Sequence, residues 1–209
     1  MASALTHAWK PRGNAAKLFI ADPARGGVAK KPSVVLAGPA GTGKSRPCLE
    51  KLHMVCMLAP GSKCLIVRRT FASIRFSALV TFQEHVAKEH IAAGLVNIYG
   101  GTVPQQIQYL NGSTIDIVGM DKPTRIMSTE YDLIYVQEAI ELELDHWNAL
   151  DSRARGTALS YRQLLADCNP SHDAHWLLQL AEEGKILMLD TQHEDNPRYF
   201  NEDGTLTEE

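Results

Sequence analysis

A glycine-rich run that ends in lysine and serine is the first feature of this sequence that could do chemistry. It follows a short apolar stretch, 33–37, and opens a stretch with helical spacing, 44–58. Its members are Gly38, Pro39, Ala40, Gly41, Thr42, Gly43, Lys44 and Ser45. Glycines let successive backbone amides point at phosphate oxygens, and the helix N-terminus adds the positive end of its dipole. We therefore expect this loop to bind ATP, with Lys44 on the β and γ phosphates and Ser45 on Mg²⁺.

A second motif places an acidic residue at the end of another apolar stretch. Residues 131–136 are followed by Gln137 and Glu138. Ligands bind at the carboxyl ends of parallel strands, so we expect Glu138 to act as the general base that positions the attacking water. Gln137 stands where an aspartate is usual, and we expect it to reach Mg²⁺ through a water, without a charge. Alternatively, Glu138 serves the metal and Glu141 or Glu143 lies nearer the water, and the sequence leaves both interpretations open.

Asn169 follows a third apolar stretch, 161–168. At that strand end its amide could bond the γ phosphate and report hydrolysis, while a simple turn before Pro170 is the alternative.

Arginines near these motifs are the candidates for DNA contacts or for a residue that stabilises the transition state. They are Arg68, Arg69, Arg75, Arg125, Arg153, Arg155 and Arg162.

The elements that must position these residues alternate along the chain. Five strands are predicted, at 33–37, 63–68, 131–136, 161–168 and 185–190. Helices are predicted at 44–58, 71–93, 144–155 and 175–183. This order predicts an α/β fold with a mostly parallel sheet. A period-two pattern over 96–99, 106–110 and 113–119, with Asn111-Gly112 before the last stretch, predicts an antiparallel hairpin inserted at a sheet edge.

The composition fits a globular domain without a strong charge bias. The chain has 209 residues and a net charge of −3, which gives no whole-protein argument for binding nucleic acid or a membrane. No apolar run approaches the ~18 residues of a membrane span. Four cysteines without Cys-x-x-Cys spacing predict reduced thiols of a cytosolic protein.

The chain is expected to divide into three parts. We expect residues 1–16 to be loosely ordered, 17–194 to form an ATPase domain, and 195–209 to begin a linker.

Five short runs, taken in order, resemble the N-terminal ATPase domain of the large terminase subunit of tailed bacteriophages. The glycine loop alone is shared by many families, and the ordered set is more specific. The runs are Gly-Pro-Ala-Gly-Thr-Gly-Lys-Ser, Leu-Ile-Val-Arg-Arg-Thr, Glu-Tyr-Asp-Leu-Ile-Tyr-Val-Gln-Glu-Ala, Cys-Asn-Pro and His-Glu-Asp-Asn-Pro. The resemblance extends from about Pro11 to the end of the chain.

The resemblance implies a P-loop NTPase of the RecA-like (ASCE) type, with helices on both faces of the sheet and strand order 5-1-4-3-2. It implies a motor that hydrolyses ATP with Mg²⁺ and moves viral double-stranded DNA into a procapsid, in the cytoplasm of the bacterial host. The implied partners are DNA, the portal ring, the small terminase subunit and further copies of the chain in a ring. Arg125 lies nearest the position of an arginine that acts in trans on a neighbour's ATP, and Asn169 matches the motif that couples hydrolysis to movement.

Two departures from the family pattern affect these expectations. Gln137 replaces the usual acid, which puts the affinity for the metal in doubt. The RNase H-like nuclease domain of the family has no counterpart in this sequence, so we expect no DNA cleavage by this polypeptide. Two other functions stay open: another P-loop motor, such as a helicase-like protein, and a nucleotide-binding assembly component that hydrolyses poorly.

Overall fold

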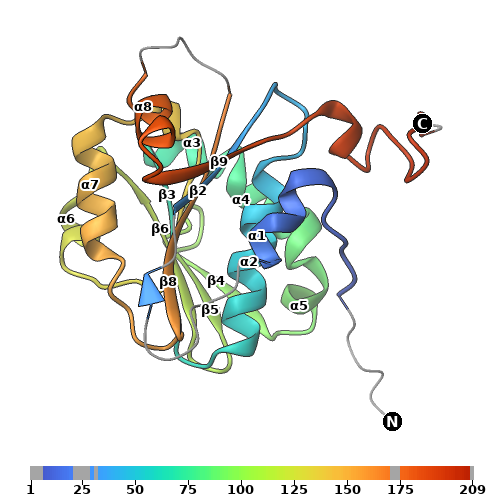
Figure 1. The fold of residues 1–209 in the computed structure, drawn as a ribbon. Coiled ribbons are helices and arrows are strands. Elements are labelled where there is room, and N and C mark those ends of the chain that lie inside the picture. Colours follow the sequence, from blue (N-terminus) through green and yellow to red (C-terminus); the bar gives the residue numbers. More distant parts are fainter. Residues whose placement is uncertain (1–6, 21–28, 31–32, 170–174, 208–209) are drawn as a thin grey trace.

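The fold is built on one twisted, mostly parallel sheet (Figure 1), described by a computed structural model for residues 7–20, 29–30, 33–169 and 175–207. The strand order is β4-β5-β6-β3-β7-β8-β2-β9, and β1 pairs with β8 outside this path. The strands are β1 (Ala29–Lys30), β2 (Ser33–Ala37), β3 (Lys63–Arg68), β4 (Val96–Tyr99), β5 (Gln106–Tyr109), β6 (Thr114–Gly119), β7 (Leu133–Val136), β8 (Tyr161–Cys168) and β9 (Ile186–Asp190).

The five strands predicted from apolar runs are confirmed, and so is their order. Counted along the chain as first to fifth, they are β2, β3, β7, β8 and β9, and they lie as 5-1-4-3-2 across the sheet. Every neighbouring pair among them is parallel. Their carboxyl ends therefore meet at a single edge of the sheet, where loops from distant parts of the sequence come together.

The predicted insertion at a sheet edge is also confirmed. β5 is antiparallel to both β4 and β6, whereas β6 joins the main sheet parallel to β3. Gly112 turns the chain between β5 and β6 with φ +84°, a conformation that favours glycine. The insertion thus extends the sheet on the side away from β2.

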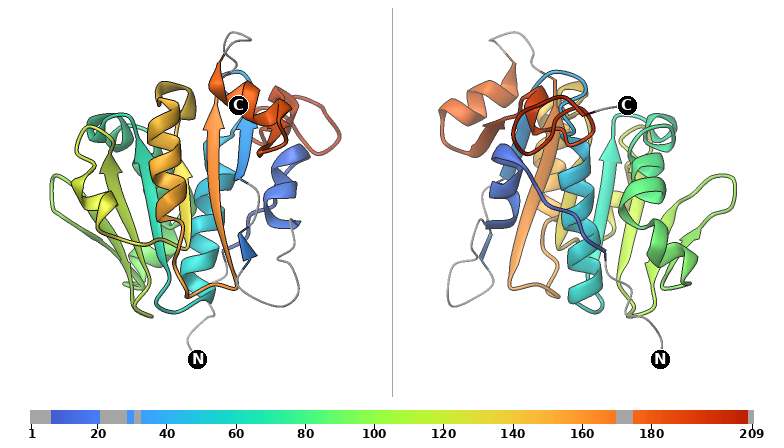
Figure 2. Two further views of the ribbon diagram at one scale, coloured as in Figure 1. Left: turned by 60° about the vertical axis from the view of Figure 1, so that its left-hand side comes forward. Right: turned by 90° about the vertical axis from the view of Figure 1, so that its right-hand side faces the viewer.

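Helices cover both faces of the sheet, as the two views of Figure 2 show with α7 in front in one and α2 in front in the other. α2 buries Leu49 and Leu52 against one face, and α7 buries Trp147 and Leu150 against the other. Each such side chain contributes roughly 1.5–3 kcal/mol on burial. The helices are α1 (Lys17–Ile20), α2 (Ser45–Leu58), α3 (Phe71–Arg75), α4 (Ala78–Thr81), α5 (Lys88–Ala92), α6 (Thr124–Met127), α7 (Leu144–Arg153) and α8 (Trp176–Glu182).

The prediction of one long helix over 71–93 is wrong. The segment is divided into α3, α4, a π-helical turn (Phe82–Val86) and α5. Ser77 separates α3 from α4 with φ −132° and ψ −88°, and its hydroxyl donates to the Ser73 carbonyl at 2.7 Å. Serine hydroxyls compete with backbone amides for such carbonyls, so an apolar periodicity alone overestimates the length of a helix here.

Segments near the two ends of the chain lie together beside β9. Arg12 Nη1 donates to the Phe200 carbonyl at 2.5 Å, and Lys10 Nζ lies 2.8 Å from Glu202 Oε1. Asn14 Nδ2 donates to the Asp190 carbonyl at the end of β9. The described parts of both segments therefore make specific contacts, and the division of the chain at 16 and 194 stays a prediction. In the described ranges, no helix has the length and apolar character needed to cross a bilayer.

Candidate nucleotide site

The glycine loop connects the carboxyl end of β2 to the first turn of α2. Gly41 and Gly43 have φ of +85° and +82°, so the loop needs glycine at both positions. Gly38 is required for a different reason, because a Cβ there would collide with both the hydroxyl and the backbone oxygen of Thr191. Thr42 Oγ1 also lies 2.9 Å from Thr191 Oγ1, so the segment after β9 supports the loop.

Lys44 points back into this loop, and its side chain is nearly buried. Its Nζ donates to the carbonyls of Gly38 and Pro39 at 2.9 and 2.8 Å, and to Asn169 Oδ1 at 3.0 Å. Asn169, predicted from the end of the stretch 161–168, is thus brought to the glycine loop. An ammonium held at this point lies where a phosphate chain wrapped by the loop would pass.

Glu138 follows β7 and has φ +49° and ψ +56°, the only positive φ outside glycine in the part of the chain described. For an L-residue this conformation costs roughly 1–2 kcal/mol, and such strain is often held in place at functional sites. Here a hydrogen bond from the Glu138 amide to Asp167 Oδ1, 2.8 Å long, holds the turn. Burial, followed by the charge of Asp167, raises the pKa of the Glu138 carboxyl, which makes it a better proton acceptor when ionised.

Glu138 and the glycine loop line the same cavity, of about 290 Å³. The lining residues are Ala40, Gly41, Gly43, Lys44, Ser45, Arg46, Thr81, Glu138, Asn169 and Asn196. Glu138 and the glycine loop therefore face one common space, as the sequence-based interpretation requires.

Gln137 and the two alternative acids do not line this cavity. Gln137 is only 3% exposed, and its Oε1 lies 2.8 Å from Ser77 Oγ. Glu141 forms a two-point pair with Arg68, at 2.9 and 2.6 Å. Glu143 caps the N-terminus of α7. The geometry therefore favours Glu138 over both alternatives as the carboxylate that faces the nucleotide loop.

Asp167 is the site residue that the sequence analysis missed. It is 1% exposed, and its Oδ2 accepts hydrogen bonds from Ser45 Oγ at 2.5 Å and Tyr135 OH at 3.0 Å. Burial raises the pKa of this carboxyl, while its hydrogen bonds and the charge of Lys44 oppose that rise. A signal was present in the sequence, because Asp167 stands two residues before Asn169 and strand residues two apart face the same side.

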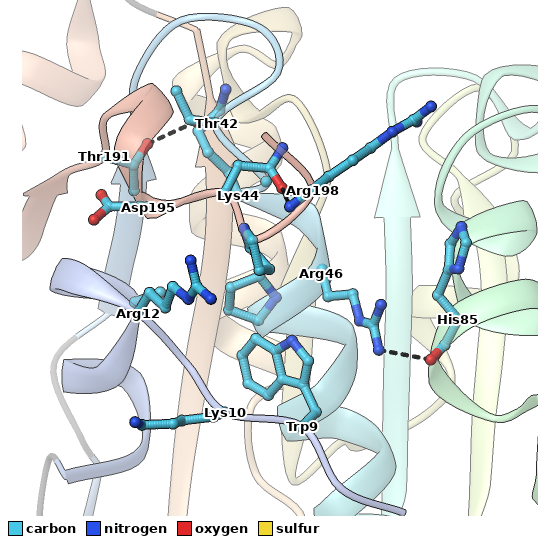
Figure 3. A pocket seen from close by; sticks show the side chains of 15 residues that line it. Trp9, Lys10, Arg12, Thr42, Lys44, Arg46, His85, Thr191, Asp195 and Arg198 are labelled. Atoms are coloured by element: carbon cyan, nitrogen blue, oxygen red, sulfur yellow. Dashed lines mark hydrogen bonds between the residues drawn. The ribbon is translucent and has the colours of Figure 1, made fainter. Parts of the chain in front are cut away.

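A larger cavity, of about 640 Å³, opens on the other side of the loop between the N-terminal segment and the C-terminal tail (Figure 3). It shares Gly43, Lys44, Arg46 and Asn196 with the smaller cavity and adds Trp9. Cations dominate its lining, with Lys10, Arg12, Lys44, Arg46 and Arg198 against the single carboxylate Asp195. Such a lining suits an anionic ligand that carries a flat apolar group.

The C-terminal tail also contacts the glycine loop directly. Asn196 Nδ2 donates to the Gly41 carbonyl at 2.6 Å, and Asn196 lines both cavities. Asn196 belongs to the run His-Glu-Asp-Asn-Pro on which the resemblance rests, so a residue of the segment predicted to begin a linker contacts the nucleotide loop. Arg125 lies in α6, and its side chain falls outside the part of the structure that is described.

In the described ranges, His, Cys, Asp and Glu side chains do not gather in groups of three or more that could hold a metal ion. In Mg²⁺–nucleotide sites, one or two protein oxygens commonly act together with phosphates and water. The Ser45 hydroxyl and the nearby carboxylates are oxygen donors of the kind that Mg²⁺ prefers, so the residues present fit such a site.

The family model described as phage terminase large subunit matches residues 30–206. The chain belongs to the phage terminase large subunit family. The PBSX phage terminase large subunit of Bacillus subtilis (strain 168) is 26% identical over 142 residues, which is 68% of this chain and 32% of that protein. The chain thus spans about a third of the length of that relative.

Solved structures of terminases share the fold. The large terminase of a thermophilic bacteriophage superposes with a TM-score of 0.68 at 14% identity, over 90% of this chain and 47% of that one. The same terminase in complex with ATP-gamma-S gives 0.60 at 14% identity, over 79% and 41%. The N-terminal domain of the DNA packaging ATPase of bacteriophage phi29 gives 0.51 at 14% identity, over 72% and 80%. At this level of identity the likenesses show that the fold is shared: a mostly parallel sheet with helices and an antiparallel pair.

Proposed function

We propose that this chain is the ATPase part of a phage DNA-packaging motor, which hydrolyses ATP to move viral double-stranded DNA into a procapsid. The observation that carries the proposal is the shared cavity of Glu138 and the glycine loop. The names of relatives support it, since one terminase was crystallised with ATP-gamma-S and another is called a DNA packaging ATPase. The family assignment adds support for packaging over other P-loop motors.

In this proposal the two cavities hold two parts of ATP. The loop amides and Lys44 bind the phosphates in the smaller cavity. The adenosine lies in the larger cavity, where Trp9 offers an aromatic face and Arg12 and Arg198 offer positive charge. The shared residues Gly43 and Lys44 mark the boundary between the two parts.

Glu138 orients the attacking water and accepts its proton, because it lines the phosphate cavity at the strained turn after β7. Asn169 bonds Lys44 and so connects the phosphate chain to the end of β8. Mg²⁺ held at Ser45 would offset the negative charge that develops on the transferred phosphoryl group. A change at the γ phosphate is thereby passed to β8, as a coupling residue requires.

The partners belong to the same proposal. Double-stranded DNA, the portal ring, the small terminase subunit and further copies of the chain in a ring are those that the resemblance implies, inside the bacterial host cell. A net charge of −3 means that DNA contacts arise from local arginines or from the ring as a whole. Arg125 is the proposed trans-acting arginine.

The test is the substitution Glu138→Gln, with phosphate release and nucleotide binding measured on the same preparation. We expect ATP binding within a few-fold of the parent and turnover reduced by about 10²–10⁴-fold. Glu143→Gln, which alters an acid that only caps α7, is the matched control and should keep turnover. Lys44→Ala should abolish turnover with the fold intact, and double-stranded DNA should stimulate the parent ATPase.

Normal turnover in Glu138→Gln or in Lys44→Ala would contradict the enzyme assignment. Tight nucleotide binding without any turnover in the parent would instead favour an assembly component that does not hydrolyse ATP. A DNA-stimulated activity that separates strands would favour a helicase-like motor.

A further inference from the structure

The nucleotide site lacks the expected carboxylate at position 137, but it has another carboxylate one strand closer to the glycine loop. Gln137 brings no charge, and its amide oxygen is engaged by Ser77. Asp167 lies on β8, which is the direct neighbour of β2, whereas β7 is separated from β2 by β8. Adjacent strands lie about 4.8 Å apart, so an acid at the end of β8 reaches the start of α2 without a long side chain.

The contact between Ser45 and Asp167 has the form that a metal-binding serine needs. A serine hydroxyl has one proton and two lone pairs, so a serine that offers its lone pairs to a cation must donate its proton to another acceptor. Ser45 Oγ donates to Asp167 Oδ2 at 2.5 Å, which turns the hydroxyl lone pairs away from Asp167. The hydroxyl can thus offer a lone pair to a cation bound at the loop, beside this carboxylate and not in line with the Ser45–Asp167 hydrogen bond.

The hydrogen bonds of Asp167 use three of its acceptor sites and leave one unused. An ionised carboxylate has about four lone-pair sites. Three donors fill three of them: the Ser45 hydroxyl and the Tyr135 hydroxyl on Oδ2, and the Glu138 amide on Oδ1. The three donors also fix the orientation of the carboxylate, whose side chain is almost completely buried.

We propose that Asp167 supplies the carboxylate of the Mg²⁺ shell in this chain, in the place that Gln137 was expected to take. The inference deepens the proposed function, because it names the charge that holds the metal at the same site. Asp167 accepts a hydrogen bond from a water bound to Mg²⁺, while Ser45 offers its hydroxyl oxygen to the ion. Gln137 then has a structural role, in which it holds the break between α3 and α4 through Ser77.

The test compares Asp167→Asn with Gln137→Ala by titrating Mg²⁺ into protein that holds the fluorescent nucleotide mant-ATP. Binding of mant-ATP in EDTA is measured first and should be unchanged in both variants. The Mg²⁺ midpoint should rise by about 10–100-fold in Asp167→Asn and by less than about threefold in Gln137→Ala. Asp116→Asn, which alters another buried aspartate in β6 that accepts from Gln106 and Tyr131, is the control for the loss of a buried charge.

Three results would overturn the assignment. One is an unchanged Mg²⁺ midpoint in Asp167→Asn, and another is a midpoint shift carried by Gln137→Ala instead. The third is a loss of mant-ATP binding by Asp167→Asn that is as large in EDTA as in Mg²⁺. That result would make Asp167 a support of the loop. Failure of the parent protein to bind mant-ATP in either condition would refute the proposed function itself, so the two failures are distinguishable.

A second measurement needs no variant and covers the case in which Asp167→Asn does not fold. Fe²⁺ replaces Mg²⁺ in the parent protein with ATP, and ascorbate with hydrogen peroxide then cleaves the backbone near the ion. We expect cleavage around Ser45 and around Asp167. Cleavage around Ser45 and Gln137, with none near Asp167, would overturn the proposal.

Discussion

Gly38 is the residue at which the glycine loop has the least room. A methyl group there would meet both the hydroxyl and the backbone oxygen of Thr191, and the backbone oxygen cannot rotate away. We expect Gly38→Ala to lower the free energy of unfolding by about 1–3 kcal/mol and to weaken ATP binding, because the loop must move away from β9. Urea unfolding and mant-ATP titration measure the two effects.

The variant Gly184→Ala is the control that separates the loss of stability from the loss of ATP binding. Gly184 has φ +69°, and a Cβ there would have no neighbour within 4 Å, so the variant is strained by its backbone alone. It should lose roughly 1–2 kcal/mol of stability and keep its ATP affinity. An equal loss of ATP affinity in both variants would show that general destabilisation, and not the contact with Thr191, explains the result for Gly38.

The sequence predicted the residues whose importance lies in their spacing along the chain. The loop of Lys44 and Ser45 is a local motif, and Glu138 and Asn169 each follow an apolar strand directly. Asp167 is different, because its contact with Ser45 exists only when β8 lies beside β2. Its spacing from Asn169 marks it as a candidate, but the contact with Ser45 follows only from the strand order, which places β8 beside β2.

At the scale of elements, α2, α5 and β5 meet around a buried histidine. His53 is 3% exposed, and its ring nitrogens lie 2.8 Å from Tyr109 OH and 3.2 Å from His90 Nδ1. Burial, with His90 and His7 adding to it, lowers the pKa of His53 from 6.5 to about 3. The ring is therefore neutral in the folded protein at pH 5 and charged in the unfolded chain.

The free energy of unfolding should consequently fall as the pH drops below 6.5, the pKa of His53 in the unfolded chain. Below pH 6.5 the unfolded chain binds a proton that the folded protein excludes, so His53 alone should cost about 2 kcal/mol between pH 7 and pH 5. We expect His53→Gln to lose much less stability over this range in urea unfolding. His85→Gln, at an exposed position, should follow the parent. A parent whose stability is the same at both pH values would contradict the buried, neutral His53.

The elements were predictable where a single pattern decides them. Parallel strands buried on both faces read as apolar runs, and Asn111-Gly112 marks the turn of the insertion. The segment 71–93 was mispredicted because Ser77 bonds side chains and carbonyls that periodicity does not reveal. The larger cavity was missed for a related reason: its walls, the N-terminal segment and the tail, meet only through long-range contacts such as that of Arg12 with Phe200.

At the scale of the whole molecule, the proposed motor depends on subunit boundaries. Ring interfaces are heterologous, so each boundary combines the nucleotide site of one subunit with a different surface of its neighbour. Under the proposal, Glu138 serves its own subunit's ATP and Arg125 serves the neighbour's. The two residues then belong to one catalytic unit that no single chain contains.

This division of labour predicts complementation in mixed rings. Rings of Arg125→Ala alone and rings of Glu138→Gln alone should both be inactive, the first for lack of transition-state charge and the second for lack of a base. In a random equal mixture, about a quarter of the boundaries pair an intact Glu138 site with an intact Arg125, and ATPase activity should return there. DNA-stimulated phosphate release, followed as the two variants are mixed in different ratios, measures it.

The ratio dependence is the decisive part of the measurement. A trans-acting Arg125 gives activity that is highest near equal proportions and vanishes at both ends, because each active boundary needs one subunit of each kind. An arginine that serves its own subunit gives no activity at any ratio, since every chain then lacks either its base or its arginine. A flat, inactive profile from mixtures shown to assemble would therefore remove Arg125 from the trans role.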